Sequence, residues 1–292
     1  MFETSPNPTA PSSPARQGLY QQRCYLRPAM PLSLWATCRH LLYLLDGTVY
    51  SLLFDAHERL VGCWGYTREP GTTQDIFLRF LFEKEPHLAQ PYLEVEVRLA
   101  EVPFLVIPHR FTARPYHLAL SRLMMEEDLL SEELHEQPLP GEDAYALFDA
   151  PPPLRHILDH YLGHYQLGHA CGAWLRTLRR LADAQGNALL MTLLPHRVAI
   201  AALREGTLQI CNAYPTHSPL EALYYLQSVR EIIGWKGTPP AIFAQGEVTP
   251  DPNQVDTLWY HLPGLQTPPS RLLLSYELPA SSEAWRFAFL ST

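Results

Sequence analysis

The sequence has few charged residues and no long apolar run. Charged side chains make up 18% of the 292 residues, and the formal net charge is −8. Because nucleic-acid-binding proteins usually carry a basic stripe, this acidic balance predicts that the chain does not bind nucleic acid. No window reaches the roughly 18 consecutive apolar residues that a membrane-spanning helix needs, so no membrane span is expected. The opening residues show no basic start and no apolar run, which predicts no secretory signal.

Cysteine is scarce, and its pattern argues against a disulfide framework. The five cysteines are widely spaced, and no two form a C-x-x-C pair; they are Cys24, Cys38, Cys63, Cys171 and Cys211. A disulfide framework needs an even set, and a thiolate zinc site needs closely spaced pairs. We therefore interpret the cysteines as reduced thiols of a cytoplasmic protein.

Proline is abundant, with 28 residues, and it crowds the start of the sequence. Pro6, Pro8, Pro11 and Pro14 stand among serine, threonine and asparagine. Such a stretch cannot offset its ordering entropy by burying apolar surface. Residues 1–19 are therefore predicted to be a disordered proline-rich tail, and a proline-rich recognition peptide is the alternative. The rest of the chain, 47% apolar overall, can bury a sizeable core.

The first half has the pattern of an antiparallel meander followed by helices and further strands. Apolar runs at 32–36, 41–45, 49–54 and 60–66 predict four short strands. Asp46-Gly47 separates the second run from the third, and glycine accepts the positive φ of a tight hairpin. Further elements are predicted as a helix at 72–83, strands at 93–99, 104–107 and 144–148, and helices at 116–125, from 154 and at 174–184.

The second half repeats this order. Runs at 188–194, 197–203 and 207–214 predict a second meander, and Ser218 with Glu221 has capping-box spacing before a helix that ends near Gly234. A strand at 241–244, a helix at 255–261 and a strand at 271–276 follow. Because this period is far longer than a solenoid unit, we interpret the chain as a duplicated α/β protein with subdomains at 20–184 and 185–292.

Several segments carry a resemblance to a known superfamily. They are the strand 104–108 (FLVIP), the strand 206–214 (GTLQICNAY), the helix 220–233 with Tyr224 and Tyr225, and the segment 242–247 (IFAQGE). In this order they resemble the actin-like ATPases, a ribonuclease H-like fold shared by heat-shock chaperone ATPases, sugar kinases and pilus-assembly ATPases. More narrowly, the chain resembles a bacterial family of domains of unknown function, found mainly in Bacteroidetes. The resemblance covers about residues 30–290 and implies two similar halves, each a mixed sheet with a three-strand antiparallel meander plus helices.

The resemblance also implies where a nucleotide would bind. In the superfamily, one hairpin from each half holds the phosphates with an Asp and a Gly-Thr or Gly-Ser turn. Asp46, Gly47 and Thr48 are the first-half candidates, but their spacing is one residue shorter than D-x-G-T, and an ordinary hairpin is the preferred explanation. The second hairpin, residues 193–197 (LLPHR), has neither Asp nor Gly. At the adenosine position only Gly246 remains, followed by an acidic residue.

These departures predict degenerate nucleotide loops. The preferred hypothesis is a non-catalytic actin-like scaffold or partner-binding protein that needs no cofactor. Under this hypothesis the chain binds an unidentified protein partner, and formation of a homo-oligomer is possible. The alternative is an active ATPase that binds Mg-ATP. Tyr224, Tyr225, Trp235 and Trp259 are candidates for an interface, although core packing is the preferred explanation for them.

A histidine cluster gives a third hypothesis, a metal-dependent hydrolase. His156, His160 and His164 stand at i, i+4 and i+8, and imidazoles four residues apart on one helix can share a metal ion. However, no H-E-x-x-H motif is present, and Gly163 favours an end of the helix there. An exposed, histidine-rich helix is therefore the preferred explanation, and no metal is expected.

Overall fold

The chain divides into two compact units. The structure, a computed structural model, describes residues 15–16, 18–26, 28, 30–111, 134–235, 240–246, 260–262 and 265–266. The first unit contains the described residues up to Val97 together with Pro153–Leu167, and the second contains Arg98–Pro152 and the described residues from Gly168 to 266. The boundaries expected from the sequence, 20–184 and 185–292, stay a prediction.

The first unit is built on a seven-stranded sheet with the order β1-β2-β5-β4-β3-β6-β10. Its strands are β1 (Ala15–Arg16), β2 (Tyr20–Leu26), β3 (Arg39–Leu45), β4 (Thr48–Phe54), β5 (Leu60–Arg68), β6 (Glu94–Leu99) and β10 (Gln166–His169), of which β6 and β10 continue into the second unit. β3, β4 and β5 pair antiparallel as consecutive strands, which confirms the predicted meander. β1 lies within the stretch predicted as a disordered tail, and residues 1–14 lie outside the described residues.

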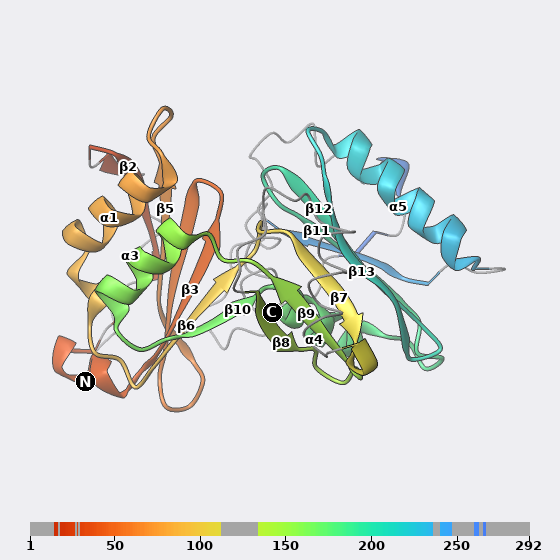
Figure 1. The fold of residues 1–292 in the computed structure, drawn as a ribbon, viewed down its shortest axis with the longest axis horizontal. Coiled ribbons are helices and arrows are strands. Elements are labelled where there is room, and N and C mark those ends of the chain that lie inside the picture. The colour runs from red at the N-terminus through yellow and green to blue at the C-terminus, as the bar shows by residue number, and fades with distance from the viewer. Residues whose placement is uncertain are drawn as a thin grey trace, which may run out of the picture. The chain divides into compact units, whose positions relative to one another are not determined.

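Two helices of the first unit, α1 (Gln74–Lys84) and α3 (Pro152–Leu162), lie side by side on one face of this sheet (Figure 1). The ring of Phe82 on α1 stacks on that of Tyr161 on α3, with centroids 5.0 Å apart. Phe77 and Leu81 of α1 are fully buried, because their spacing of four residues places both on the face of α1 that meets the sheet. The apolar periodicity over 72–83 therefore predicted this helix correctly.

The strand predicted at 32–36 is wrong, because these residues form the 3₁₀ helix η1 (Leu32–Thr37). Short local hydrogen bonds satisfy its backbone: the Leu34 amide donates to the Pro31 carbonyl at 3.0 Å, and the Cys38 amide to the Trp35 carbonyl at 2.9 Å. Leu34 is 49% exposed, so its apolar side chain does not mark a buried strand. Two further 3₁₀ helices are η2 (Pro86–Ala89) and η3 (His109–Phe111).

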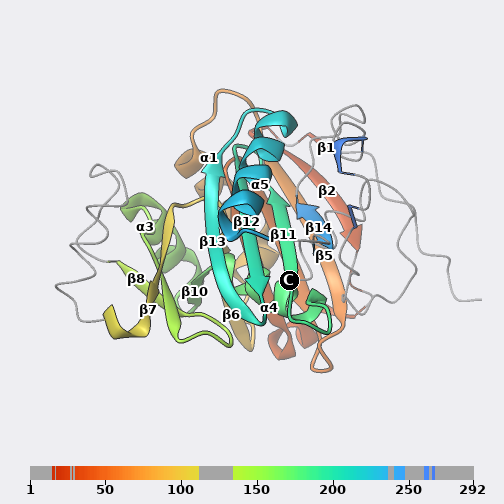
Figure 2. The ribbon, with the colours of Figure 1, turned by 90° about the vertical axis from the view of Figure 1, so that its right-hand side faces the viewer.

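The second unit contains a four-stranded sheet, β13-β12-β11-β14, and a three-stranded sheet, β7-β9-β8. Its elements are β7 (Phe104–Pro108), β8 (His135–Pro138), β9 (Ala144–Phe148), α4 (Cys171–Leu181), β11 (Ala188–Leu193), β12 (Arg197–Arg204), β13 (Thr207–Pro215), α5 (Pro219–Ile233) and β14 (Ile242–Gly246). Figure 2 shows α5 lying across the four-stranded sheet. The core between them is apolar and includes Leu189, Met191, Val198, Ile200, Ala222, Leu226 and Val229.

The ends of α5 follow from local sequence. The Glu221 amide donates to the hydroxyl of Ser218 at 3.3 Å, and the Glu221 carboxylate accepts the amide of His217 at 2.7 Å. At the other end Gly234 adopts the left-handed conformation, with φ 65°. Its amide donates to the carbonyls of Arg230 and Glu231 in the last turn of the helix. Both ends are therefore those that the capping-box spacing and the glycine predicted.

The two units share one strand order. In the first, the meander β3-β4-β5 is followed by α1 and by β6, which lies beside β3 and gives the order β5-β4-β3-β6. In the second, β11-β12-β13 is followed by α5 and by β14, which pairs parallel to β11 and gives β13-β12-β11-β14. This repeat confirms the duplicated α/β fold. Of the other predicted elements, the helix at 116–125, most of that at 255–261 and the strand at 271–276 lie outside the described residues.

Candidate functional site

The turn between β3 and β4 holds the first-half nucleotide candidates, and groups of the same unit already occupy it. Gly47 has a φ of +78°, as the two-residue hairpin requires. The Asp46 carboxylate accepts a hydrogen bond from the Arg68 guanidinium at 3.0 Å. The Gly47 amide donates to the side-chain oxygen of Gln74 at 3.3 Å, and Thr48 is buried. Both the carboxylate and the amide that would serve a nucleotide therefore bind side chains of this unit.

The turn between β11 and β12 is the corresponding place in the second unit. Pro195 supplies no amide donor there, and the Leu194 amide donates across the turn to the Arg197 carbonyl at 2.9 Å. The His196 amide donates to the carboxylate of Glu101 at 3.2 Å. A carboxylate of the chain thus accepts the hydrogen of this turn amide, and its negative charge disfavours an anionic phosphate there.

Gly246, at the end of β14, has a structural reason to be glycine. Its φ is +132°, and a Cβ atom at this position would lie 2.0 Å from the Leu193 carbonyl oxygen on β11. Beside it, Gln245 is fully buried and donates to the Thr192 hydroxyl at 3.2 Å. Close pairing with β11 therefore explains this glycine without a ligand. The acidic residue after it, Glu247, lies outside the described residues.

The three histidines of the metal hypothesis do not share one helix. His156 and His160 are exposed on α3, which ends at Leu162 because Gly163 adopts a φ of +67°. His164 follows that end, so the helical i+8 relation does not exist. In the part of the chain that the structure describes, no three His, Cys, Asp or Glu side chains lie close enough together to hold a metal ion.

The predicted site residues fall into three separate groups. Asp46, Gly47 and Thr48 form one turn of the first unit, Gly246 belongs to the second unit, and the histidines lie on or after α3. Of the aromatic interface candidates, Tyr225 and Trp235 pack partly buried against the core of the second unit, whereas Tyr224 is 69% exposed. Trp259 lies outside the described residues.

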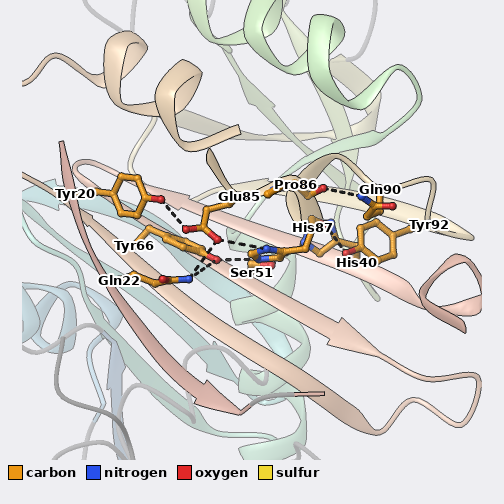
Figure 3. Close-up of polar contacts among 10 residues, drawn as sticks. All are labelled: Tyr20, Gln22, His40, Ser51, Tyr66, Glu85, Pro86, His87, Gln90 and Tyr92. Carbon is orange, nitrogen blue, oxygen red and sulfur yellow. Dashed lines mark hydrogen bonds and ion pairs between the residues drawn. The ribbon is translucent and has the colours of Figure 1, made fainter. Parts of the chain in front are cut away.

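A buried polar network, which the sequence analysis missed, lies in the first unit (Figure 3). The Tyr20 hydroxyl donates to Glu85 Oε1 at 2.6 Å, and the Gln22 amide lies 3.4 Å from Glu85 Oε2. His87 places Nδ1 3.5 Å from the same carboxylate and Nε2 2.8 Å from the Tyr66 hydroxyl. The network fastens β2 and β5 to the segment that follows α1.

Burial controls protonation in this network. It raises the pKa of Glu85 above its usual 4.5, although hydrogen bonds from Tyr20 and Gln22 act in the opposite direction. Burial lowers the pKa of His87 to about 4, and it raises the pKa of Tyr66 far above its usual range. His87 is therefore neutral near pH 7, with Nδ1–H facing Glu85 and Nε2 accepting from Tyr66. Because these groups are buried or half-buried and bind one another, the network is suited to stabilising the unit rather than to acting on a substrate.

Two other histidines are buried and neutral. His40 Nε2 lies 2.8 Å from the Ser51 hydroxyl, and burial lowers the pKa of His40 to about 3. His169 in the second unit accepts the Cys171 amide on Nδ1 at 3.0 Å and lies 3.1 Å from the Val102 carbonyl through Nε2. Burial also lowers the pKa of His169 to about 3. The His40–Ser51 pair is fully buried, so it offers no accessible nucleophile.

The repeated strand order defines the class of this protein, the actin-like ATPase fold. A solved Bacteroides thetaiotaomicron protein with this fold and unknown function aligns with a TM-score of 0.73 at 10% identity, over 89% of this chain and 98% of that one. The PilM–PilN type IV pilus biogenesis complex aligns with a TM-score of 0.55 at 12% identity, over 86% and 96%. At these identities the likeness shows the fold alone.

The family follows from the sequence match. Residues 41–263 match the family described as "Protein of unknown function (DUF3822)", and the chain belongs to this family. No curated protein matches the chain. In the described residues no helix has the length and apolar character that crossing a membrane requires.

Proposed function

We propose that this protein is a non-catalytic actin-like protein that binds a protein partner and no longer holds ATP. The observation that carries the proposal is the occupancy of both hairpin turns by the chain's own side chains. Arg68 neutralises Asp46 in the first turn, and the side-chain oxygen of Gln74 accepts the hydrogen bond of the Gly47 amide. In the second turn the carboxylate of Glu101 accepts the hydrogen bond of the His196 amide.

Electrostatics favours this proposal over an active ATPase. A carboxylate that orients Mg²⁺ must face the metal, but Asp46 is paired with a guanidinium that would repel a cation. A triphosphate at the second turn would meet the negative charge of Glu101 instead of a free amide. Pro195 removes another donor from the same turn. The first turn therefore disfavours a metal ion at Asp46, and the second disfavours a phosphate.

The partner-binding part of the proposal rests on analogy. PilM, whose fold this chain shares, is found in a complex with PilN. Fold alone does not fix function, so PilN itself is not proposed as the partner. None of the five cysteines forms a disulfide, which supports a cytoplasmic location, because an oxidising compartment favours paired thiols.

The experiment is a calorimetric titration of the full chain with Mg-ATP, combined with an assay for released phosphate. We expect no saturable heat and no phosphate release above the protein-free control. Arg68→Ala and Glu101→Ala variants report whether the occupied turns are the cause, because each frees one turn group without touching the core. Micromolar binding with phosphate release by the unmodified chain would support the active ATPase instead.

A further inference from the structure

The outward side of α5 carries large apolar side chains. Leu220, Tyr224 and Ile232 are 58%, 69% and 80% exposed. At about 100° of rotation per residue they fall within a sector of about 120°, opposite the buried Ala222 and Val229. They extend over about 18 Å of helix at a rise of about 1.5 Å per residue. We call these three residues the α5 outer surface.

Aromatic rings continue the α5 outer surface onto the neighbouring strand. Tyr224 meets Tyr225 edge to face, with centroids 5.6 Å apart, and Tyr225 stacks on Tyr214 of β13 at 4.6 Å. Tyr214 and Tyr225 are partly buried against the core, which fixes their ring planes. A fixed pair of tyrosines beside an exposed third is the kind of aromatic surface on which proline rings pack.

The chain itself contains a matching proline-rich segment. Pro8, Pro11 and Pro14 are spaced by three residues, and Pro14 directly precedes β1 at Ala15. A polyproline II helix has three residues per turn, so it would present these three prolines along one edge. At about 3.1 Å per residue, Pro8 to Pro14 would span about 19 Å, close to the length of the α5 outer surface.

We propose that the α5 outer surface binds the segment 6–14 of a second copy of this chain. The proposal rests on the proposed partner-binding function and names the surface and the partner. Leu220, Tyr224 and Ile232 are exposed and therefore accessible to a second copy. A polyproline II segment loses little conformational entropy on binding, so a short apolar contact suffices. Because the segment and the surface differ, each copy can bind one neighbour and be bound by another.

The first test uses a labelled synthetic peptide of residues 3–16 and the full chain carrying Pro8→Ala, Pro11→Ala and Pro14→Ala. In this receptor the chain's own segment no longer competes for the surface. Fluorescence anisotropy should show saturable binding, and Tyr224→Ala in the receptor should weaken it by about tenfold, as loss of an aromatic anchor does. Tyr260→Ala, at another exposed tyrosine, is the matched control and should leave affinity unchanged within about twofold.

The second test is sedimentation of the unmodified full chain over a range of concentrations. We expect self-association that Tyr224→Ala and the triple proline variant both abolish, with unchanged circular dichroism. No peptide binding, equal binding by Tyr224→Ala, or a chain that stays monomeric would overturn the proposal. Equal binding of a peptide with the same composition but without the three-residue proline spacing would also overturn it. None of these outcomes bears on Mg-ATP, so the proposed loss of nucleotide binding is tested separately.

Discussion

Acid should destabilise this protein through three histidines, the buried His40 and His169 and the half-buried His87. Their ordinary pKa is 6.5, and burial lowers the folded-state pKa to about 3, 4 and 3. Below pH 6.5 these histidines are therefore protonated in the unfolded chain while they stay neutral in the folded chain. Stability is complete above pH 6.5 and falls as the pH decreases towards the folded-state values.

The magnitude follows from proton linkage. One pKa unit corresponds to about 1.36 kcal/mol, so at pH 5 each histidine costs about 2 kcal/mol relative to pH 7.5. The first unit, with His40 and His87, loses about 4 kcal/mol, and the second, with His169, loses about 2 kcal/mol. Glu85 acts in the opposite direction, because its raised pKa lets the folded state take up a proton first. One carboxyl group cannot offset two imidazoles, so the first unit still loses stability.

The assay is urea unfolding followed by circular dichroism at several pH values between 7.5 and 5. We expect the free energy of unfolding to fall by several kcal/mol, a large part of the roughly 5–15 kcal/mol typical of a domain. His40→Asn can keep a hydrogen bond to Ser51 but removes one titrating group, so it should reduce the pH dependence by about 2 kcal/mol at pH 5. His156→Asn, at an exposed position, is the control. A free energy of unfolding that does not change with pH, or an unchanged pH dependence in His40→Asn, would show that these histidines do not control acid stability.

Two further substitutions test the buried network and the end of β14. Glu85→Ala should lower the free energy of unfolding by about 2–3 kcal/mol, because it leaves the buried Tyr20 hydroxyl without its acceptor, and Glu85→Gln should restore part of the loss. A Glu85→Ala protein as stable as the unmodified one in urea would contradict this. Gly246→Ala should cost at least about 3 kcal/mol, because its Cβ would collide with the Leu193 carbonyl. Gly206→Ala is the matched control, since it combines a positive φ with open space and should cost only about 1 kcal/mol. Equal losses in thermal unfolding would show that backbone conformation alone, and not the collision, decides both positions.

Local signals predicted the elements that local hydrogen bonds define. Asp46-Gly47 correctly predicted the turn between β3 and β4, because a two-residue hairpin needs the positive φ that Gly47 adopts. Ser218 and Gly234 correctly predicted the two ends of α5, because both act as caps through local hydrogen bonds. The repeated order of strands and helices was readable because each unit keeps its meander contiguous in sequence.

Contacts between distant residues could not be predicted in this way. Tyr20 and Glu85 are 65 residues apart, and nothing near Glu85 in sequence indicates a buried acceptor. β2 was missed because its side chains after Tyr20 are only partly buried, so its apolar alternation is weak. Likewise, Glu101 and His196 are in contact although 95 residues separate them, and the pattern of the turn itself indicated only that Asp and Gly are absent from it. The residue that binds this turn in place of the missing Asp and Gly is determined by tertiary contacts, which the local sequence does not indicate.

The amide NMR spectrum of the full chain during addition of Mg-ATP shows whether the two hairpin turns bind a nucleotide. We expect the Gly47 and His196 amide signals to keep their positions, because Gln74 and Glu101 already accept these hydrogens. Saturable movement of both signals at micromolar Mg-ATP would show that a nucleotide displaces these side chains, and the protein would then have kept its nucleotide site.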